Sequence, residues 1–368
     1  MFAERVARAR RVMADHDIDA LLLSVGADLP YLTGYEAMPL ERLTMLVLPL
    51  DDRPTLVVPA LEAPRVIERS DVFAMRPWSE SERPIGIVAE LVGARRSLAI
   101  GDHTWSGFLV DLQAELPGAR FSRASVVTSA LRAVKDAAEI ESLRRAAAAV
   151  DRIATRLRAG EIALVGQTEA AVSAELGRQI VDEGHQRVNF AIVAVGANAA
   201  SPHHEAGDRV IGSGEIVLCD FGGTMVDEWG VGYCSDITRC VHIGAPPADV
   251  AEAYAVLHEA QQASVRAATV GRPAEQVDAA GRAIIADAGY GDRFIHRTGH
   301  GIGVEAHEDP YIVEGNTTPL VPGHAFSIEP GIYVDGAWGM RLEDIVVASD
   351  DGPDALNRVD HALAVIDG

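Results

Sequence analysis

Short apolar runs, separated by more polar stretches, dominate the first third of the chain. The segments 19–25 (DALLLSV), 43–50 (LTMLVLPL), 54–60 (PTLVVPA) and 97–102 (SLAIGD) have the length and apolar character of buried strands. Residues 4–15 and 61–69 are predicted to form helices between such strands. This alternation predicts an α/β layer for the N-terminal part of the chain.

A long helical stretch begins at residue 136 and marks a change in organisation. Residues 136–158 combine strong helix formers with an apolar stripe at helical spacing, which includes Ile140, Leu143, Ala147 and Val150. The chain has 368 residues, more than the roughly 250–300 at which a single hydrophobic core stops growing. We therefore predict two domains, residues 1–130 and residues 131–368, the second of which opens with this helix.

The second domain contains an internal repeat. The dipeptide Val-Gly at 165–166 recurs 105 residues later at 270–271, and a second register, offset by 109 residues, places Asp220 opposite Glu329. Two related halves that pack about a pseudo-two-fold axis would join their antiparallel sheets into one curved sheet, with the carboxylates near its centre. Chance alignment of glycine and valine is the alternative. Other matched pairs are Val172 with Val277, Ile180 with Ile285, Gly184 with Gly289, and Gly214 with Gly323.

Charge and cysteine content restrict the class of protein. The 54 Asp and Glu against 32 Lys and Arg leave a formal net charge of -22, which disfavours a nucleic-acid partner. No apolar run approaches the roughly 18 residues of a membrane span, and the charged first residues are unlike a signal peptide. The three cysteines lack CxxC spacing and suit free, buried thiols in a reducing compartment. We expect a cytoplasmic protein that does not associate with membranes.

Four acidic residues and one histidine of the second domain lie on strand-like stretches beside glycine or proline turns. They are Asp220 in LCDFGG, Asp236 in YCSDITR, His300 in HRTGHGIG, Glu329 in SIEPGIY and Glu343 in RLEDIVV. An unpaired carboxylate inside an apolar strand is costly to bury and needs a cation or strong donors. A single carboxylate of this kind could be explained as a capping group or as the partner in a salt bridge. Five together form a hard, oxygen-rich ligand set and predict a metallohydrolase with two divalent cations.

Strand periodicity shows which neighbours share a face with these ligands. Residues two apart on a strand point the same way, so Thr238 accompanies Asp236 and Arg341 accompanies Glu343. Arg341 is therefore expected either to hold a ligand carboxylate or to reach the substrate carboxylate through a bidentate contact.

The motifs of the second domain resemble those of the pita-bread metallopeptidase family, in the branch of prolidase (Xaa-Pro dipeptidase) and aminopeptidase P. The matching motifs are SPHH, SDITR, HRTGHGIGVEAHE, SIEPGIY and RLED. Through DLPYLTGY the first domain is similar, less specifically, to the creatinase/prolidase N-terminal domain. The resemblance implies an α+β protein in which a smaller α/β domain precedes a C-terminal pita-bread (creatinase/aminopeptidase-like) domain with a pseudo-two-fold repeat.

The resemblance also implies a ligand set. Asp220, Asp236, His300, Glu329 and Glu343 would hold two divalent ions per chain, with Asp236 and Glu343 bridging them. Four carboxylates and one imidazole favour manganese, magnesium or cobalt over the thiolate-rich sites that zinc prefers, and the family implies manganese or cobalt. Two cations roughly 3.5 Å apart would lower the pKa of a shared water, so that a bridging hydroxide is the expected nucleophile.

Four residues are expected to act on the substrate. Glu329 would take the proton of the water and pass it to the leaving nitrogen, and His307 would donate to the developing oxyanion. The family's other site residues correspond to His203, expected near the proline ring, and Arg341, with His296 flanking the same pocket. A dedicated site suits proline because its ring replaces the amide N–H that ordinary peptidases recognise.

Alternative functions stay open at this level. Aminopeptidase P has the same metal centre as the predicted Xaa-Pro dipeptidase but accepts longer peptides with proline second. Methionine aminopeptidase is disfavoured because its chains usually lack such an N-terminal domain. A metal-free or non-catalytic pita-bread protein would have lost ligands that this chain keeps. By family analogy the enzyme is expected to be a homodimer that acts on small peptides.

Two features depart from the family pattern. The segment between Asp220 and Asp236 holds 15 residues, several more than this branch usually has, and we expect the insertion to lie in a hairpin turn. A shifted register would replace Asp220 as a ligand by Asp227 or Glu228. Cys240 stands where threonine is common, which we interpret as a packing change.

Overall fold

Two units make up the chain in the computed structural model, which describes residues 1–368. The first unit comprises Met1–Arg132 together with Asp227–Gly232, and the second comprises Ala133–Val226 and Tyr233–Gly368. None of the helices is both long and apolar enough to span a membrane.

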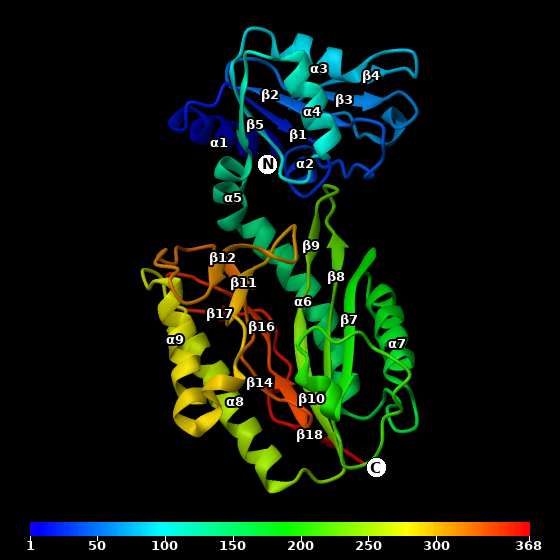
Figure 1. The fold of residues 1–368 in the computed structure, drawn as a ribbon, viewed down its shortest axis with the longest axis vertical. Helices are drawn as coiled ribbons and strands as arrows, with labels where there is room; N and C mark the ends of the chain where they lie inside the picture. Colours follow the sequence, from blue (N-terminus) through cyan, green and yellow to red (C-terminus); the bar gives the residue numbers. More distant parts are fainter. The chain divides into compact units, whose positions relative to one another are not determined.

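The first unit is built on a six-stranded mixed sheet of order β4-β3-β2-β1-β5-β6 (Figure 1). The strands are β1 (Ala20–Leu23), β2 (Met45–Pro49), β3 (Thr55–Pro59), β4 (Ala74–Trp78), β5 (Ser97–Ile100) and β6 (Arg120–Arg123). The helices are α1 (Phe2–Asp15), α2 (Asp28–Thr33), α3 (Pro84–Val92), α4 (Ser106–Glu115) and α5 (Ser125–Ala133). Apolar side chains of α3 and α4, including Val88 and Leu112, pack against Leu22 and Val57 of the sheet. The predicted α/β layer is confirmed.

The helix predicted over residues 61–69 is wrong. Only a 3-10 turn, η1 (Ala63–Arg65), forms there, with Pro64 in its first turn. Leu61 and Ile67 are 56% and 61% exposed, so the segment buries too little apolar surface to stabilise a longer helix. Strands β4 and β6 escaped prediction because AMRPW contains a proline and RFSR is mostly polar.

The second unit places strands between two pairs of helices (Figure 1). Helices α6 (Ala137–Arg158) and α7 (Glu169–Asp182) contact the sheet β18-β10-β8-β7, whereas α8 (Ala248–Ala267) and α9 (Ala274–Ile285) contact strands of the later part of the chain. Short helices are η2 (Gly196–Ala200), η3 (Ala286–Tyr290) and η4 (Gly291–Arg293). The strands are β7 (Arg187–Val195), β8 (Ile216–Val226), β9 (Gly232–Cys234), β10 (Ile237–Ile243), β11 (Gly299–Gly301), β12 (Glu308–Ile312), β13 (Ala325–Ile328), β14 (Gly331–Val334), β15 (Trp338–Arg341), β16 (Asp344–Val347), β17 (Asp354–Ala355) and β18 (Ala364–Ile366).

Helix α6 confirms the strongest local prediction. Asp136 caps it by accepting from the backbone N–H groups of Ala138 and Glu139, and the Glu139 side chain accepts from the Asp136 N–H in return. This capping box satisfies backbone donors that the first helical turn leaves unpaired. The predicted stripe is buried at Leu143, Ala147 and Val150.

The internal repeat is visible in the backbone. Gly166 and Gly271 both have a positive φ, of 79° and 84°, in the turns that precede α7 and α9. Their N–H groups donate to Ile211 and Leu320, which are 109 residues apart, at 2.9 and 2.8 Å. The same turn therefore closes against the same partner in each half, as a duplicated unit would.

The two halves do not merge into the single continuous sheet that we predicted. The strands form one sheet of order β18-β10-β8-β7, in which β8 also pairs with β9, a second of order β12-β11-β13-β16-β17, and the hairpin β14-β15. One isolated antiparallel bridge, between Thr238 and Glu343, connects the first two sheets. The carboxylates lie at this junction as expected, but the hydrogen-bonded ladder is interrupted there.

All three cysteines are free and buried, as predicted. Cys240 packs in the core with Leu218 and Leu257 and donates a weak hydrogen bond to the Arg341 carbonyl at 3.4 Å. Its environment is that of a packing residue.

Buried His324 provides a test of acid stability. Burial, with a smaller contribution from Lys135, lowers the pKa of His324 to about 4, against about 6.5 in an unfolded chain. Between these values the unfolded state binds a proton that the folded state does not, so stability should fall as the pH falls from about 6.5 to about 4. In His324→Gln we expect the free energy of unfolding to fall by about 1–3 kcal/mol less over this pH range than in the parent chain. Urea unfolding at several pH values measures this difference. His16→Gln, at an exposed position, should leave the profile unchanged, and equal profiles for both variants would contradict the assignment.

Candidate metal centre

The first half of the second unit supplies two aspartates from neighbouring strands. Asp220 lies on β8 and is paired in register with Thr238 of β10, and Asp236 precedes β10 on the face shared with Thr238. Gly222 allows the close chain approach between them, since a Cβ on it would lie 2.1 Å from the Ser235 carbonyl oxygen.

The long segment that follows Asp220 does not displace that residue from the site. Strands β8 and β9 form a hairpin whose tip, Asp227–Gly232, belongs to the first unit. Asp227 holds this turn by accepting from the N–H groups of Trp229 and Val231 at 2.9 and 2.8 Å. The insertion therefore extends the hairpin, and the alternative ligands Asp227 and Glu228 lie at its tip.

The second half supplies a histidine and two glutamates. His300 lies on β11, Glu329 follows β13 and Glu343 precedes β16. A Cβ on Gly299 would lie 1.8 Å from the Ser327 carbonyl oxygen, so glycine is needed for β11 to approach β13. Ser327 Oγ accepts from the His300 backbone N–H and donates to Glu329 Oε1, both at 3.0 Å, which ties the Glu329 carboxylate to the backbone of β11.

The five side chains gather at the junction of the two sheets. Ligand atoms of Asp236, His300 and Glu343 all lie within 4.8 Å of one another, and all three residues are buried. His300 Nε2 lies 3.2 Å from Glu329 Oε1 and 3.8 Å from Asp236 Oδ2. Asp220 lies at the edge of the group, where its Oδ2 accepts from Arg341 Nη2 at 2.5 Å.

Burial and mutual repulsion make ionisation of this cluster unfavourable. Burial, followed by the charges of Glu343 and Asp220, raises the pKa of Asp236 well above its usual value. Burial, followed by Glu329 and Asp220, does the same to the pKa of Glu343. The pKa of Asp220 is also raised by burial, even though Arg341 acts against it.

Glu329 differs from its three neighbours. Burial opposes its ionisation, but the hydrogen bond and charge of His300, with His296 and Arg341, outweigh burial and hold the pKa of Glu329 at about 2. Glu329 is therefore a carboxylate at neutral pH.

The donor set fits divalent cations. Asp220 Oδ1 is buried and has no hydrogen-bond partner, and one guanidinium, that of Arg341, faces four carboxylates. Buried carboxylates without compensating charge cost several kcal/mol. Oxygen ligands with one imidazole suit manganese, magnesium or cobalt, so cations at this junction would relieve both the repulsion and the unpaired oxygen.

Arg341 organises one wall of the site. Besides Asp220, it donates through Nε to Thr238 Oγ1 at 3.1 Å and through Nη1 to the Tyr333 hydroxyl at 2.9 Å. The Tyr333 hydroxyl also lies 2.9 Å from His296 Nε2. Burial raises the pKa of Tyr333 to about 12, so the phenol stays neutral.

Two residues of this network were missed as site residues from the sequence. Thr238 donates to Glu343 Oε2 at 2.7 Å, and its shared face with Asp236 was the available signal. Tyr333 lies four residues after Glu329 in the EPGIY motif, but nothing in that spacing shows that its hydroxyl would meet Arg341.

The two histidines expected to contact substrate occupy exposed positions. The His307 ring is edge-on to His300, with ring centroids 4.1 Å apart. Partial burial, followed by the charge of His300, lowers the pKa of His307, which is therefore neutral at pH 7. His203 follows Pro202, whose carbonyl accepts from Arg341 Nη1 at 3.4 Å.

Three further histidines have structural partners. His204 contacts the fully buried Glu169 at 2.8 Å, His242 contacts the Gly244 carbonyl at 2.8 Å, and His361 contacts Asp344 at 2.5 Å.

Comparison with known proteins gives two family matches that together cover most of the chain. Residues 141–350 match the model of metallopeptidase family M24, and residues 5–134 match the creatinase/prolidase N-terminal domain.

Individual relatives are similar over nearly their whole length. The chain is 44% identical to the probable dipeptidase PepE of Mycobacterium tuberculosis, covering 100% of this chain and 97% of that protein. It is 37% identical to an Xaa-Pro dipeptidase of Lactobacillus helveticus, covering 96% of each. The crystal structure of a recombinant prolidase from Thermococcus sibiricus superposes with a TM-score of 0.92 at 35% identity, covering 100% of this chain and 99% of that one.

Proposed function

The chain belongs to metallopeptidase family M24, and we propose that it hydrolyses the bond before proline in Xaa-Pro dipeptides. The convergence of Asp236, His300 and Glu343, with ligand atoms within 4.8 Å, is the observation that carries this proposal. The names of its relatives support the substrate class, since they include an Xaa-Pro dipeptidase and a prolidase.

We propose that Asp220, Asp236, His300, Glu329 and Glu343 hold two divalent cations, manganese or cobalt. Bound there, the metal would activate water and polarise the scissile carbonyl. Asp236 and Glu343 are the proposed shared ligands because they meet at the junction of the two sheets. The Thr238 hydrogen bond to Glu343 leaves that carboxylate one preferred orientation.

The remaining steps are assigned to side chains of this chain. Ionised Glu329 accepts a proton from water and returns it to the proline nitrogen as the bond breaks. Neutral His307 donates a hydrogen bond to the oxygen that gains negative charge. His203 lines the side occupied by the proline ring, and Arg341, already anchored by Asp220 and Tyr333, orients the substrate carboxylate or a ligand.

Aminopeptidase P activity is the second candidate, since the same ligand set would serve longer peptides. We keep the dipeptidase first because the relatives that are 44% and 37% identical over nearly the full chain are named dipeptidases. Homodimerisation and a cytoplasmic location are further proposals that rest on the family resemblance, and light scattering on the purified chain tests the first of them.

The test is hydrolysis of an Xaa-Pro dipeptide, the matching Xaa-Pro-Xaa tripeptide and an Xaa-Ala dipeptide, with metal content measured on the same sample. We expect cleavage of the first substrate only, abolished by a chelator and restored by Mn²⁺ or Co²⁺. Preferential cleavage of the tripeptide would identify an aminopeptidase. An active preparation with less than one metal ion per chain would contradict a two-metal centre.

A further inference from the structure

The junction that carries the candidate ligands has little backbone hydrogen bonding of its own. Thr238 belongs to β10 of one sheet, and Asp236 directly precedes that strand, whereas Glu343 directly precedes β16 of another sheet. The backbone pairing between the two sheets is limited to the isolated bridge between Thr238 and Glu343. The one backbone bond across it, from the Glu343 N–H to the Thr238 carbonyl, is long at 3.3 Å. Something other than a strand ladder must fix the spacing of the ligands.

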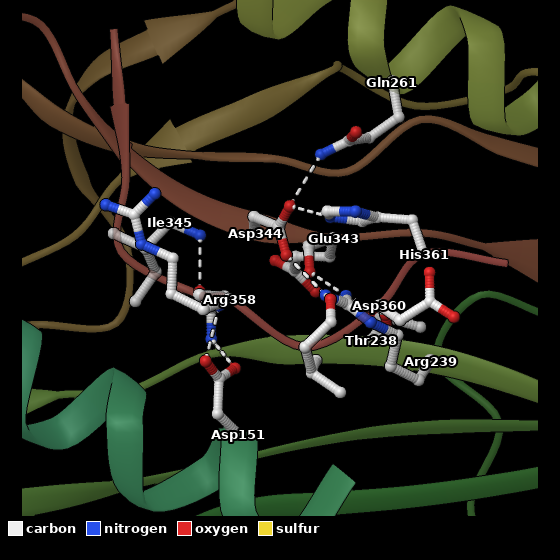
Figure 2. Close-up of polar contacts among 12 residues, drawn as sticks. Asp151, Thr238, Arg239, Gln261, Glu343, Asp344, Ile345, Arg358, Asp360 and His361 are labelled. Carbon is white, nitrogen blue, oxygen red and sulfur yellow. Dashed lines mark hydrogen bonds and ion pairs between the residues drawn. The ribbon is translucent and has the colours of Figure 1, made fainter. Parts of the chain in front are cut away.

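Arg239 bridges this junction from behind the site. Its side chain is fully buried, and Nη1 donates to the carbonyls of both Thr238 and Glu343, at 3.0 and 2.7 Å. Nη2 donates to Asp344 Oδ1 at 2.7 Å and to the Val359 carbonyl at 3.1 Å. One guanidinium therefore connects the backbone of both ligand-bearing strands, and Figure 2 shows it lying between them.

Asp344 anchors the guanidinium in turn. It is buried directly after Glu343, and its Oδ2 accepts from Gln261 Nε2 of α8 at 3.0 Å and contacts His361 Nε2 at 2.5 Å (Figure 2). Because Asp344 balances the charge of Arg239, the arginine has no need of a ligand carboxylate as its counter-ion and leaves the ligands free for cations.

The C-terminal segment closes the arrangement. Ile345 of β16 donates its N–H to Asn357 Oδ1 at 2.9 Å, and Asn357 donates to Asp151 of α6 at 3.0 Å. The strand that follows Glu343 is thus held on both sides, by Arg239 and by this tail.

We propose that Arg239 and Asp344 are positioning residues that set the distance between Asp236 and Glu343 and thereby the affinity of the centre for metal. Neither side chain touches the site itself. They act through the Thr238 and Glu343 carbonyls, which move with the ligand side chains. This inference rests on the proposed metal centre and adds to it a determinant outside the ligand set.

Arg239→Lys is the informative change. Lysine keeps the positive charge beside Asp344 but lacks the planar fork that reaches two carbonyls and a carboxylate together. Changes to residues that hold metal ligands in place typically weaken metal affinity by about 10–100-fold. We expect a loss of that size for Mn²⁺ alone, measured by calorimetry on the chelator-treated full chain. Asp344→Asn, which removes the anchor at constant shape, should weaken Mn²⁺ binding in the same direction.

A buried arginine remote from the ligands provides the matched control. Arg5 is 2% exposed and donates to the Tyr31 carbonyl in the first unit. Arg5→Lys should lower thermal stability without changing Mn²⁺ affinity. Should Arg239→Lys or Asp344→Asn lower stability while Mn²⁺ affinity stays that of the parent chain, the positioning role is overturned and only a structural role remains.

The remaining outcomes are also decisive. If neither variant folds, Gln261→Met removes one outer donor to Asp344 and should still weaken Mn²⁺ binding by about threefold or more; unchanged affinity would overturn the inference. Failure of the proposed function is distinguishable, because the parent chain would then bind no Mn²⁺ or leave Xaa-Pro dipeptides intact.

Discussion

Asp236→Asn is expected to remove metal from the centre and to lower kcat/KM by about 10³-fold or more, since activation of water and of the carbonyl by metal contributes several kcal/mol to catalysis. Asparagine keeps the volume of the side chain but replaces a carboxylate with a neutral amide. Asp236 lies in the tight group with His300 and Glu343 and is buried. A carboxylate from the protein surface therefore cannot take its place as a ligand. Metal analysis by mass spectrometry and dipeptide kinetics on one sample measure both effects.

His307→Ala separates metal loss from loss of catalysis. Its ring lies against His300 but is not part of the tight ligand group. We expect the metal content of the parent chain and a kcat lower by about 10²–10³-fold, the usual result of removing one donor to an oxyanion. Full activity would reject the role of His307. Full metal content and activity in Asp236→Asn would reject the proposed centre.

Lys135→Met is expected to lower the free energy of unfolding of the second unit by about 3–5 kcal/mol, because it removes the ammonium group from a buried ion pair with Glu308. The Lys135 and Glu308 side chains are 1% and 4% exposed, and Nζ lies 2.6 Å from Oε1. Packing around the pair is tight, since a Cβ on Gly303 would lie 2.3 Å from Glu308 Oε1. At about 2–4 °C per kcal/mol for a unit of this size, the melting temperature should fall by roughly 6–20 °C.

A surface pair provides the comparison for this effect. Arg178 pairs with Glu175 on α7 at 59% side-chain exposure, and Arg178→Met should leave the melting temperature close to that of the parent chain because exposed ion pairs are screened by solvent. Adding Glu308→Gln to Lys135→Met also removes the buried carboxylate charge and should recover part of the lost stability. Calorimetry on the four proteins tests this, and equal melting temperatures for Lys135→Met and Arg178→Met would show that the buried pair contributes nothing special.

Local sequence signals were most reliable where one segment carries its own stabilising features. Helix α6 has a capping box and an apolar stripe within residues 136–158, and it forms as predicted. The segment 61–69 has helix formers but leaves Leu61 and Ile67 exposed, and it forms only the turn Ala63–Arg65. Helical propensity is a weak preference that tertiary packing must support.

The glycine pattern allowed the duplicated architecture to be predicted but not how its halves meet. Gly166 and Gly271 occupy equivalent positive-φ turns in the two halves, and a positive φ is a local requirement that glycine satisfies best. Whether two sheets fuse or only touch depends on side chains between them. Arg239, buried at that junction, is the clearest case.

By itself the sequence determined the type of chemistry: four carboxylates and a histidine in strand contexts, a residue set suited to divalent cations. Residue type and strand period are local properties that can be read along the chain. The tertiary structure alone decided which groups compensate one another, such as Arg341 with Asp220 and Lys135 with Glu308, 121 and 173 residues apart. Such pairs depend on where distant segments come to rest, because charge and burial act through space and not along the chain.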